Sequence, residues 1–257
     1  MIAPIQLSPG EKAYFASDFH LGLFPYDKSK MREKLIVKWL DSIKTDAKVL
    51  FLLGDIFDFW YEYNKVIPKG YTRFLGKLAE MSDNGTQIHY FTGNHDVWVF
   101  DYLEKEIGLT VHKKDKLCQI NGKQLMVGHG DELCPNDYGY WFLKSVFKSK
   151  ILQFFFSRLH PNLALWFGQT WSKHSRLSKG ISEAFLGEDK EHQIVFARKY
   201  LQNNHADYFI YGHRHIPMDF KLTETSRLIN LGEWIHSNTY AVFDGNEMAL
   251  KHYEKLI

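Results

Sequence analysis

The sequence predicts an α/β fold built from βαβ units, with a helical segment inserted into it. In the first hundred residues, short apolar runs alternate with stretches that have the spacing of amphipathic helices, the pattern of a parallel sheet with crossover helices. From residue 138 to 182 the chain has no Asp or Glu and many aromatic residues, unlike both flanks. From Tyr208 on, short strands separated by polar turns predominate.

Three strands and two helices are expected in the first half of the chain. The predicted strands cover residues 13–17, 49–53 and 88–91, and the predicted helices cover about 27–44 and 71–82. Asn121-Gly122, between two apolar runs, predicts a two-residue β-hairpin turn, because both residues readily adopt the left-handed backbone of that turn. In the inserted segment we expect two or three helices that form a cap.

Composition and charge exclude several classes of protein. A length of 257 residues allows one or two domains, and a single domain with an insertion fits as well as two separate domains. The formal net charge of +2 is far below that of a protein that coats nucleic acid. Cys118 and Cys134 form no CxxC pair, which suggests a reduced, cytosolic protein. We expect neither a signal peptide nor a membrane-spanning helix.

Five short blocks place a side chain capable of binding a metal directly after an apolar strand. They are Asp18-Phe19-His20, Gly54-Asp55, Gly93-Asn94-His95-Asp96, Gly128-His129-Gly130-Asp131 and Gly212-His213-Arg214-His215. Loops at the carboxyl ends of parallel strands converge on one crevice, so these blocks are expected to be neighbours in space. Carboxylate, amide and imidazole donors without thiolate suit Mn, Fe, Co or Zn.

Two such cations, about 3.5–4 Å apart, would hold a phosphate ester for in-line displacement and lower the pKa of a bound water. A carboxylate between two cations is the natural bridging ligand, and Asp55 is the residue that we expect in this role. Each block is weak alone, since a single His after a strand is usually structural and Gly-Asp is commonly only a turn. Their joint occurrence after five strands indicates a metal site.

The order of these blocks resembles that of the calcineurin-like metallophosphoesterases, over about residues 18–215. The resemblance implies a four-layer αββα sandwich with an inserted helical cap, in which 1–137 and 183–257 form the core and 138–182 the cap. It implies one cation held by Asp18, His20, Asp55 and His215, and a second held by Asp55, Asn94, His129 and His213. His95 would lie near the phosphoryl group as a transition-state stabiliser or proton donor, which makes His95, Asp55 and Asn94 the expected catalytic residues.

A narrower resemblance rests on residues 54–60, 129–140 and 231–234. These segments are similar to the UDP-2,3-diacylglucosamine pyrophosphohydrolases of lipid A synthesis, which also carry an inserted helical cap. The resemblance implies cleavage of the diphosphate bond to UMP and 2,3-diacylglucosamine 1-phosphate with two divalent cations, for which we expect Mn²⁺. It also implies substrate contacts at Asn94, His95, Asp137, Tyr140, Lys173, Arg176, Lys179 and His213. One position departs from the pattern, because the best-known members have Arg where this chain has His95.

The inserted segment suits an acylated, anionic substrate. Its aromatic residues could cover two acyl chains, since burying each CH₂ group contributes about 0.8 kcal/mol. Its basic residues suit a diphosphate and anionic lipid headgroups. We therefore expect an acylated sugar nucleotide as substrate, a cytoplasmic location with peripheral contact at the inner face of the bacterial inner membrane, and neither nucleic acid nor an obligate protein partner.

Three alternatives remain open at this point. The aromatic residues could be ordinary helix-packing core, and the Lys and Arg residues merely a solvated face. Another metallophosphoesterase, acting on a nucleotide or phosphodiester, would share the five blocks but would have no use for a large apolar lining. A scaffold protein that has kept the fold without the cations would bind partners through its aromatic surface, although the intact set of donors argues against it.

Overall fold

The structure, a computed structural model, describes residues 1–134, 138–179 and 184–253, with the side chains of 138, 140, 143 and 173–179 excepted. The first sheet has six strands in the order β11-β10-β1-β2-β3-β4. Their bounds are β1 Lys12–Ala16, β2 Ala47–Leu53, β3 Gln87–Phe91, β4 Thr110–His112, β10 Thr239–Phe243 and β11 Met248–His252. Pairing is parallel from β1 to β4 and antiparallel at β10 and β11, so the predicted βαβ organisation is confirmed.

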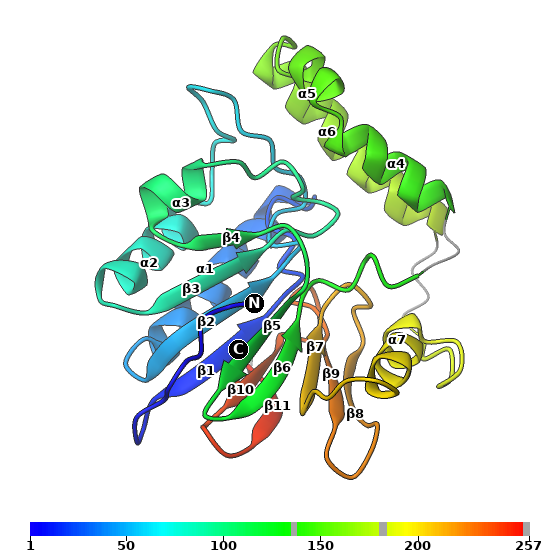
Figure 1. Cartoon of the computed structure of the whole chain (residues 1–257). Coiled ribbons are helices and arrows are strands. Elements are labelled where there is room, and N and C mark those ends of the chain that lie inside the picture. The colour runs from blue at the N-terminus through cyan, green and yellow to red at the C-terminus, as the bar shows by residue number, and fades with distance from the viewer. Residues whose placement is uncertain (135–137, 180–183, 254–257) are drawn as a thin grey trace.

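The crossover helices are α1 Tyr26–Ile43, α2 Thr72–Asp83 and α3 Tyr102–Ile107, and they lie on one face of this sheet (Figure 1). Helix α1 buries Ile36 and Trp39 against strand residues such as Leu50, because these apolar residues recur at helical spacing. The short α3 and the three-residue β4 were not predicted from the sequence.

The second sheet has five strands in the order β5-β6-β7-β9-β8. Their bounds are β5 Lys116–Ile120, β6 Lys123–Val127, β7 Tyr208–Tyr211, β8 Pro217–Lys221 and β9 Arg227–Leu231. Strands β5 and β6 form the predicted hairpin, and Asn121 and Gly122 have φ of 48° and 83°, as the expected two-residue turn requires. Helix α7, His192–Leu201, packs on this sheet through Ile194 and Ala197.

A continuous apolar core lies between the two sheets. Phe15 of β1 and Phe51 of β2 stack with ring centroids 4.8 Å apart, in one cluster with Val127 and Ile210 of the second sheet. The neighbouring residues on β1 and β2 face the helices instead, since side chains alternate along a strand. Helices, sheet, sheet and α7 thus make four layers, and the expected α/β sandwich is confirmed.

Three helices occupy the inserted segment: α4 Tyr138–Lys148, α5 Lys150–Phe156 and α6 Pro161–Lys179. Figure 1 shows them lying together, outside the two sheets. Many of their aromatic side chains are not core, since Phe142 is 73% exposed and Trp166 is 62% exposed. In the described part of the chain, no helix is both long and apolar enough to cross a membrane.

Candidate metal centre

The five polar blocks meet at one place because each follows the carboxyl end of a strand. Asp18 and His20 follow β1, Asp55 follows β2, Asn94 follows β3, His129 follows β6, and His213 and His215 follow β7. Among the described residues, ligand atoms lie within 4.8 Å of one another in the groups Asp18–His20–His215, Asp55–His129–His213 and His20–Asp55–His95. The convergence expected from the sequence is therefore a feature of the structure.

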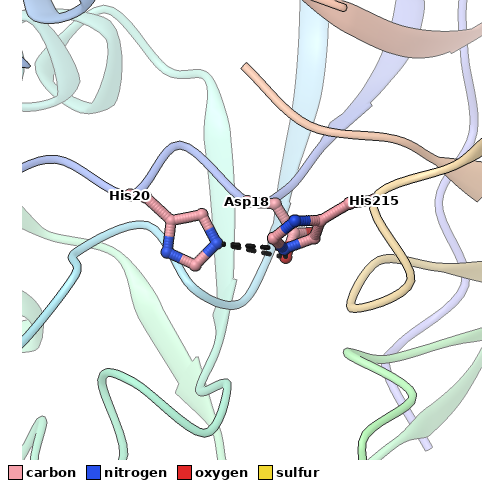
Figure 2. Close-up of side chains that lie close together, drawn as sticks. All are labelled: Asp18, His20 and His215. Atoms are coloured by element: carbon pink, nitrogen blue, oxygen red, sulfur yellow. Dashed lines mark hydrogen bonds and ion pairs between the residues drawn. The ribbon is translucent and has the colours of Figure 1, made fainter. Parts of the chain in front are cut away.

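The side chains of the first group, Asp18, His20 and His215, point toward one another (Figure 2). His20 Nε2 lies 3.1 Å from His215 Nε2, and Asp18 Oδ1 lies 3.2 Å from His215 Nε2 and 3.7 Å from His20 Nε2 (Figure 2). Asp18 Oδ1 is buried and accepts no hydrogen bond from the described residues. A buried carboxylate oxygen without a donor is costly unless a cation meets it. These three side chains fit a divalent cation.

The second group contains Asp55, whose carboxylate also approaches His20 of the first group. Asp55 Oδ2 lies 3.4 Å from His129 Nε2 and 4.0 Å from His20 Nε2, so one carboxylate faces both groups. The amide oxygen of Asn94 lies 3.3 Å from His129 Nε2, and the rings of His129 and His213 have centroids 5.1 Å apart. This is the arrangement that a bridging carboxylate between two cations needs.

His129 is held in the orientation of a ligand by the backbone. Its Nδ1 lies 2.8 Å from the carbonyl oxygen of Leu53, at the end of β2. A carbonyl can only accept, so Nδ1 carries a proton, and Nε2 is the ring nitrogen that faces Asp55 and Asn94. Metal-binding histidines commonly donate their second ring nitrogen to a carbonyl in this way.

The backbone around these side chains is strained. Asp18, His20, Asp55, His213 and His215 all have φ between 44° and 69°, the left-handed region that side chains usually avoid. They are five of the eight non-glycine residues with positive φ in the described part of the chain. Each such conformation costs on the order of 1 kcal/mol or more, and such strain tends to cluster at functional sites. The backbone strain is therefore evidence for a functional site that is separate from the evidence of the donor atoms.

Close packing between the loops depends on glycine. A Cβ added at Gly93 would lie 2.6 Å from the backbone nitrogen of Asp55 and 2.9 Å from its Cγ. A Cβ at Gly54, which has φ of +86°, would lie 2.6 Å from His129 Nδ1. These glycines therefore let Asp55 and His129 approach the neighbouring loops closely enough to share a site.

The Asp55 carboxylate and the neighbouring imidazoles stabilise each other's charged forms. Burial alone would raise the pKa of Asp55, but His129 and His95 hold it well below its usual value. Burial alone would likewise lower the pKa of His129, but Asp55 raises it well above normal. Burial, together with the neighbouring His129, lowers the pKa of His213 to about 4. A cation at His129 would bind through Nε2, so metal binding would displace a proton from that nitrogen.

All seven residues expected to hold cations therefore lie together, and His95 lies beside them with Nε2 3.9 Å from Asp55 Oδ2. The other expected substrate contacts are not placed. Asp137 lies outside the described residues, and so do the side chains of Tyr140, Lys173, Arg176 and Lys179. The mixed nitrogen and oxygen donors, buried or half-buried, fit two divalent cations.

A cavity of about 90 Å³ is lined by residues beside this centre and by residues of the inserted helices. Its polar lining residues are Asp58, Asn94, His95, Lys144 and Ser172. Its apolar walls are Phe59, Val97, Trp98, Phe147, Phe156, Phe167 and Trp171. The sequence reasoning had not singled out Phe59 or Trp98 as site residues, although Phe59 lies in the Gly54–Trp60 motif. Trp98 packs on Phe147 and Phe156 with ring centroids 5.1 and 4.7 Å apart, and so joins the core to the inserted helices.

Comparisons with known proteins show the family to which the chain belongs. The calcineurin-like phosphoesterase family matches residues 12–217 of this chain. A UDP-2,3-diacylglucosamine hydrolase from Porphyromonas gingivalis is 36% identical over 95% of this chain and 98% of its own length. A protein of the same name from Neisseria meningitidis serogroup A is 26% identical over 89% of this chain and 91% of its own. Among solved structures, Vps29 with Zn²⁺ from Entamoeba histolytica has a TM-score of 0.42 at 10% identity, over 93% of this chain and 89% of its own.

Proposed function

Because the chain belongs to the calcineurin-like phosphoesterase family, we propose that it cleaves the diphosphate bond of UDP-2,3-diacylglucosamine and releases UMP and 2,3-diacylglucosamine 1-phosphate. The observation that carries the proposal is a cavity with mostly apolar walls whose lining includes Asn94 and His95, beside the candidate metal centre. A phosphoesterase of free nucleotides has no use for such walls. Water adds to the α-phosphorus, and the acylated sugar phosphate leaves with the bridging oxygen.

The chain's own residues supply the binding and orientation. Two divalent cations, which we propose to be Mn²⁺, would supply Lewis acidity and an activated water when bound. Asp18, His20, Asp55 and His215 would hold one, and Asp55, Asn94, His129 and His213 the other. His95 Nε2 faces the centre and would stabilise negative charge that develops on the phosphoryl oxygens. Asn94 and His213 would also meet the phosphate.

The inserted segment 138–182 would form the substrate cap on a core of 1–137 and 183–257. In this proposal, Asp137 and Tyr140 contact the uridine or glucosamine part, and Lys173, Arg176 and Lys179 contact the diphosphate. The aromatic walls of the cavity would cover part of an acyl chain, and each buried CH₂ group would contribute about 0.8 kcal/mol.

We further propose that the exposed aromatic residues of the cap rest on the inner face of a bacterial inner membrane, with the protein otherwise in the cytoplasm. Phe142, Phe155 and Trp166 are all more than 60% exposed, and the segment around them has no acidic residue. Apolar side chains with basic neighbours suit the interface of an anionic bilayer. Such a surface would also receive a lipid substrate directly.

The test is to incubate the purified protein with Mn²⁺ and UDP-2,3-diacylglucosamine and to measure UMP. We expect release of UMP that is lost on chelation, and lost together with bound metal in Asp55→Asn. UDP-N-acetylglucosamine, which lacks the two acyl chains, is the matched substrate control and should react much more slowly. Hydrolysis of bis(p-nitrophenyl) phosphate without any reaction on the acylated nucleotide would overturn the substrate and favour another phosphoesterase.

A further inference from the structure

Helix α6 lies directly against the loop that follows β2. Ala164, Gly168 and Ser172 are spaced four residues apart on one side of this helix, and all three are buried. A Cβ added at Gly168 would overlap the ring of Phe59, so only a glycine lets the helix approach so closely. The same side of the helix, one turn further on, carries the hydroxyl of Ser172 to the loop.

The Ser172 hydroxyl joins two groups beside the metal centre. It is 4% exposed, and its Oγ donates to Asp58 Oδ2 at 3.1 Å. The same Oγ lies 3.1 Å from His95 Nδ1. His95 Nδ1 also lies 2.9 Å from the carbonyl oxygen of Asp58. Asp58 Oδ1 in turn lies 3.7 Å from His20 Nδ1, so this small network reaches a proposed cation ligand.

The direction of these hydrogen bonds fixes the His95 ring. A carbonyl oxygen can only accept, so His95 Nδ1 carries a proton. Since the Ser172 proton is directed to Asp58, the Ser172 oxygen is available as a second acceptor for that Nδ1 proton. The ring is thereby held from behind, and its Nε2 is turned toward the Asp55 carboxylate, 3.9 Å away.

We propose that Ser172 is a positioning residue for His95, through which the cap sets the orientation of the group that faces the phosphate. The proposal rests on the proposed function, because it takes His95 as the phosphate-facing residue. Ser172 and His95 are 77 positions apart, and one lies on the cap while the other follows β3. A cap seated on its loop therefore completes the catalytic geometry, and a displaced cap leaves the His95 ring without one of its acceptors.

The variant that tests this is Ser172→Ala, which removes the hydroxyl and keeps a side chain small enough for the close helix contact. Ser145→Ala is the matched control, because Ser145 is an exposed serine of α4 whose hydroxyl donates within its own helix, to Trp141 O. Two substrates separate the roles: UDP-2,3-diacylglucosamine needs the cap, whereas bis(p-nitrophenyl) phosphate has no acyl chain for the cap to hold.

For Ser172→Ala we expect kcat to fall roughly tenfold on both substrates, as for loss of one orienting hydrogen bond, with KM and metal content nearly unchanged. In a His95→Asn background the same change should cost less than about twofold, because the residue acts through His95. Ser145→Ala should keep wild-type kinetics.

Two results would overturn the proposal. One is a raised KM for the acylated nucleotide with unchanged kcat on both substrates, which would make Ser172 only a support for the cap or the ligand. The other is a Ser172→Ala substitution that lowers kcat by the same factor in the wild-type protein and in the His95→Asn background. If the wild-type protein cleaves bis(p-nitrophenyl) phosphate but not the acylated nucleotide, the proposed substrate is wrong. The kcat values on bis(p-nitrophenyl) phosphate then still test the role of Ser172. If it cleaves neither substrate with Mn²⁺ bound, both proposals fail.

Discussion

Replacing Gly93 by Ala should destroy the centre without unfolding the protein. The added Cβ would lie 2.6 Å from the backbone nitrogen of Asp55, whereas ordinary contacts begin near 3.4 Å, so one of the two loops has to move by about 0.8 Å. The bond from His95 N to Asp55 Oδ1, now 2.9 Å, lies in the path of that movement. The shared carboxylate would then no longer face both groups of ligands.

The cost of this displacement can be estimated in two ways. A shift of about 1 Å in a catalytic group commonly lowers turnover on the order of 100-fold, so we expect at least that loss in kcat. Overpacking of a buried loop costs about 1–3 kcal/mol, which leaves a folded protein with a lowered melting temperature. Function should therefore be lost at temperatures where the variant is still folded.

The assay combines metal content by mass spectrometry, UMP release and thermal unfolding of the same preparations. Gly76→Ala is the matched control, because Gly76 is exposed on α2 and a Cβ there meets no atom within 4 Å. In a helix this change should raise the free energy of unfolding by about 1 kcal/mol and leave activity unchanged. Wild-type metal content and turnover in Gly93→Ala would refute the geometric reasoning.

Two further predictions concern stability. Glu62→Gln should lower the free energy of unfolding by about 2 kcal/mol, because the buried carboxylate accepts from Trp60 Nε1 and from the backbone N–H groups of residues 100–102; an unchanged urea midpoint would contradict this. Burial, with His112 beside it, lowers the pKa of His89 to about 4, and burial does the same for His112. As the pH falls from about 6.5 to 4, the two histidines therefore take up protons in the unfolded chain before they do so in the folded protein, and the free energy of unfolding decreases over that window. His89→Phe should make this decrease smaller by roughly 1–2 kcal/mol after allowance for solvent screening. Urea unfolding between pH 4 and 7 measures it, and a slope equal to that of the wild type would contradict the assignment.

The metal-site residues could be predicted from the sequence where polar side chains come directly after a strand. Asp18, Asp55 and His129 could be expected to converge because each comes directly after an apolar run, and the parallel topology brings such positions to one edge of a sheet. Sheets, crossover helices and the Asn121-Gly122 turn follow from periodicity and turn chemistry in the same way.

Contacts between distant helices and loops could not be predicted in this manner. The approach of Ser172 to Asp58 joins residues 114 positions apart, and neither has a spacing that marks it. The same holds for Trp98, whose role depends on where the inserted helices come to rest. The sequence also left open whether the aromatic residues of the cap were core, because periodicity cannot tell a buried helix face from an exposed apolar one.

The left-handed backbone at five of the donors limits which substitutions the chain can tolerate there. Asn adopts this conformation at least as readily as Asp does, whereas β-branched residues do not. Asp18→Asn would thus keep the backbone conformation of the loop but remove a negative charge that would bind the cation. A single substitution could therefore produce a protein that has the same fold but no longer binds the cation or catalyses the reaction, and its structure would not show the loss.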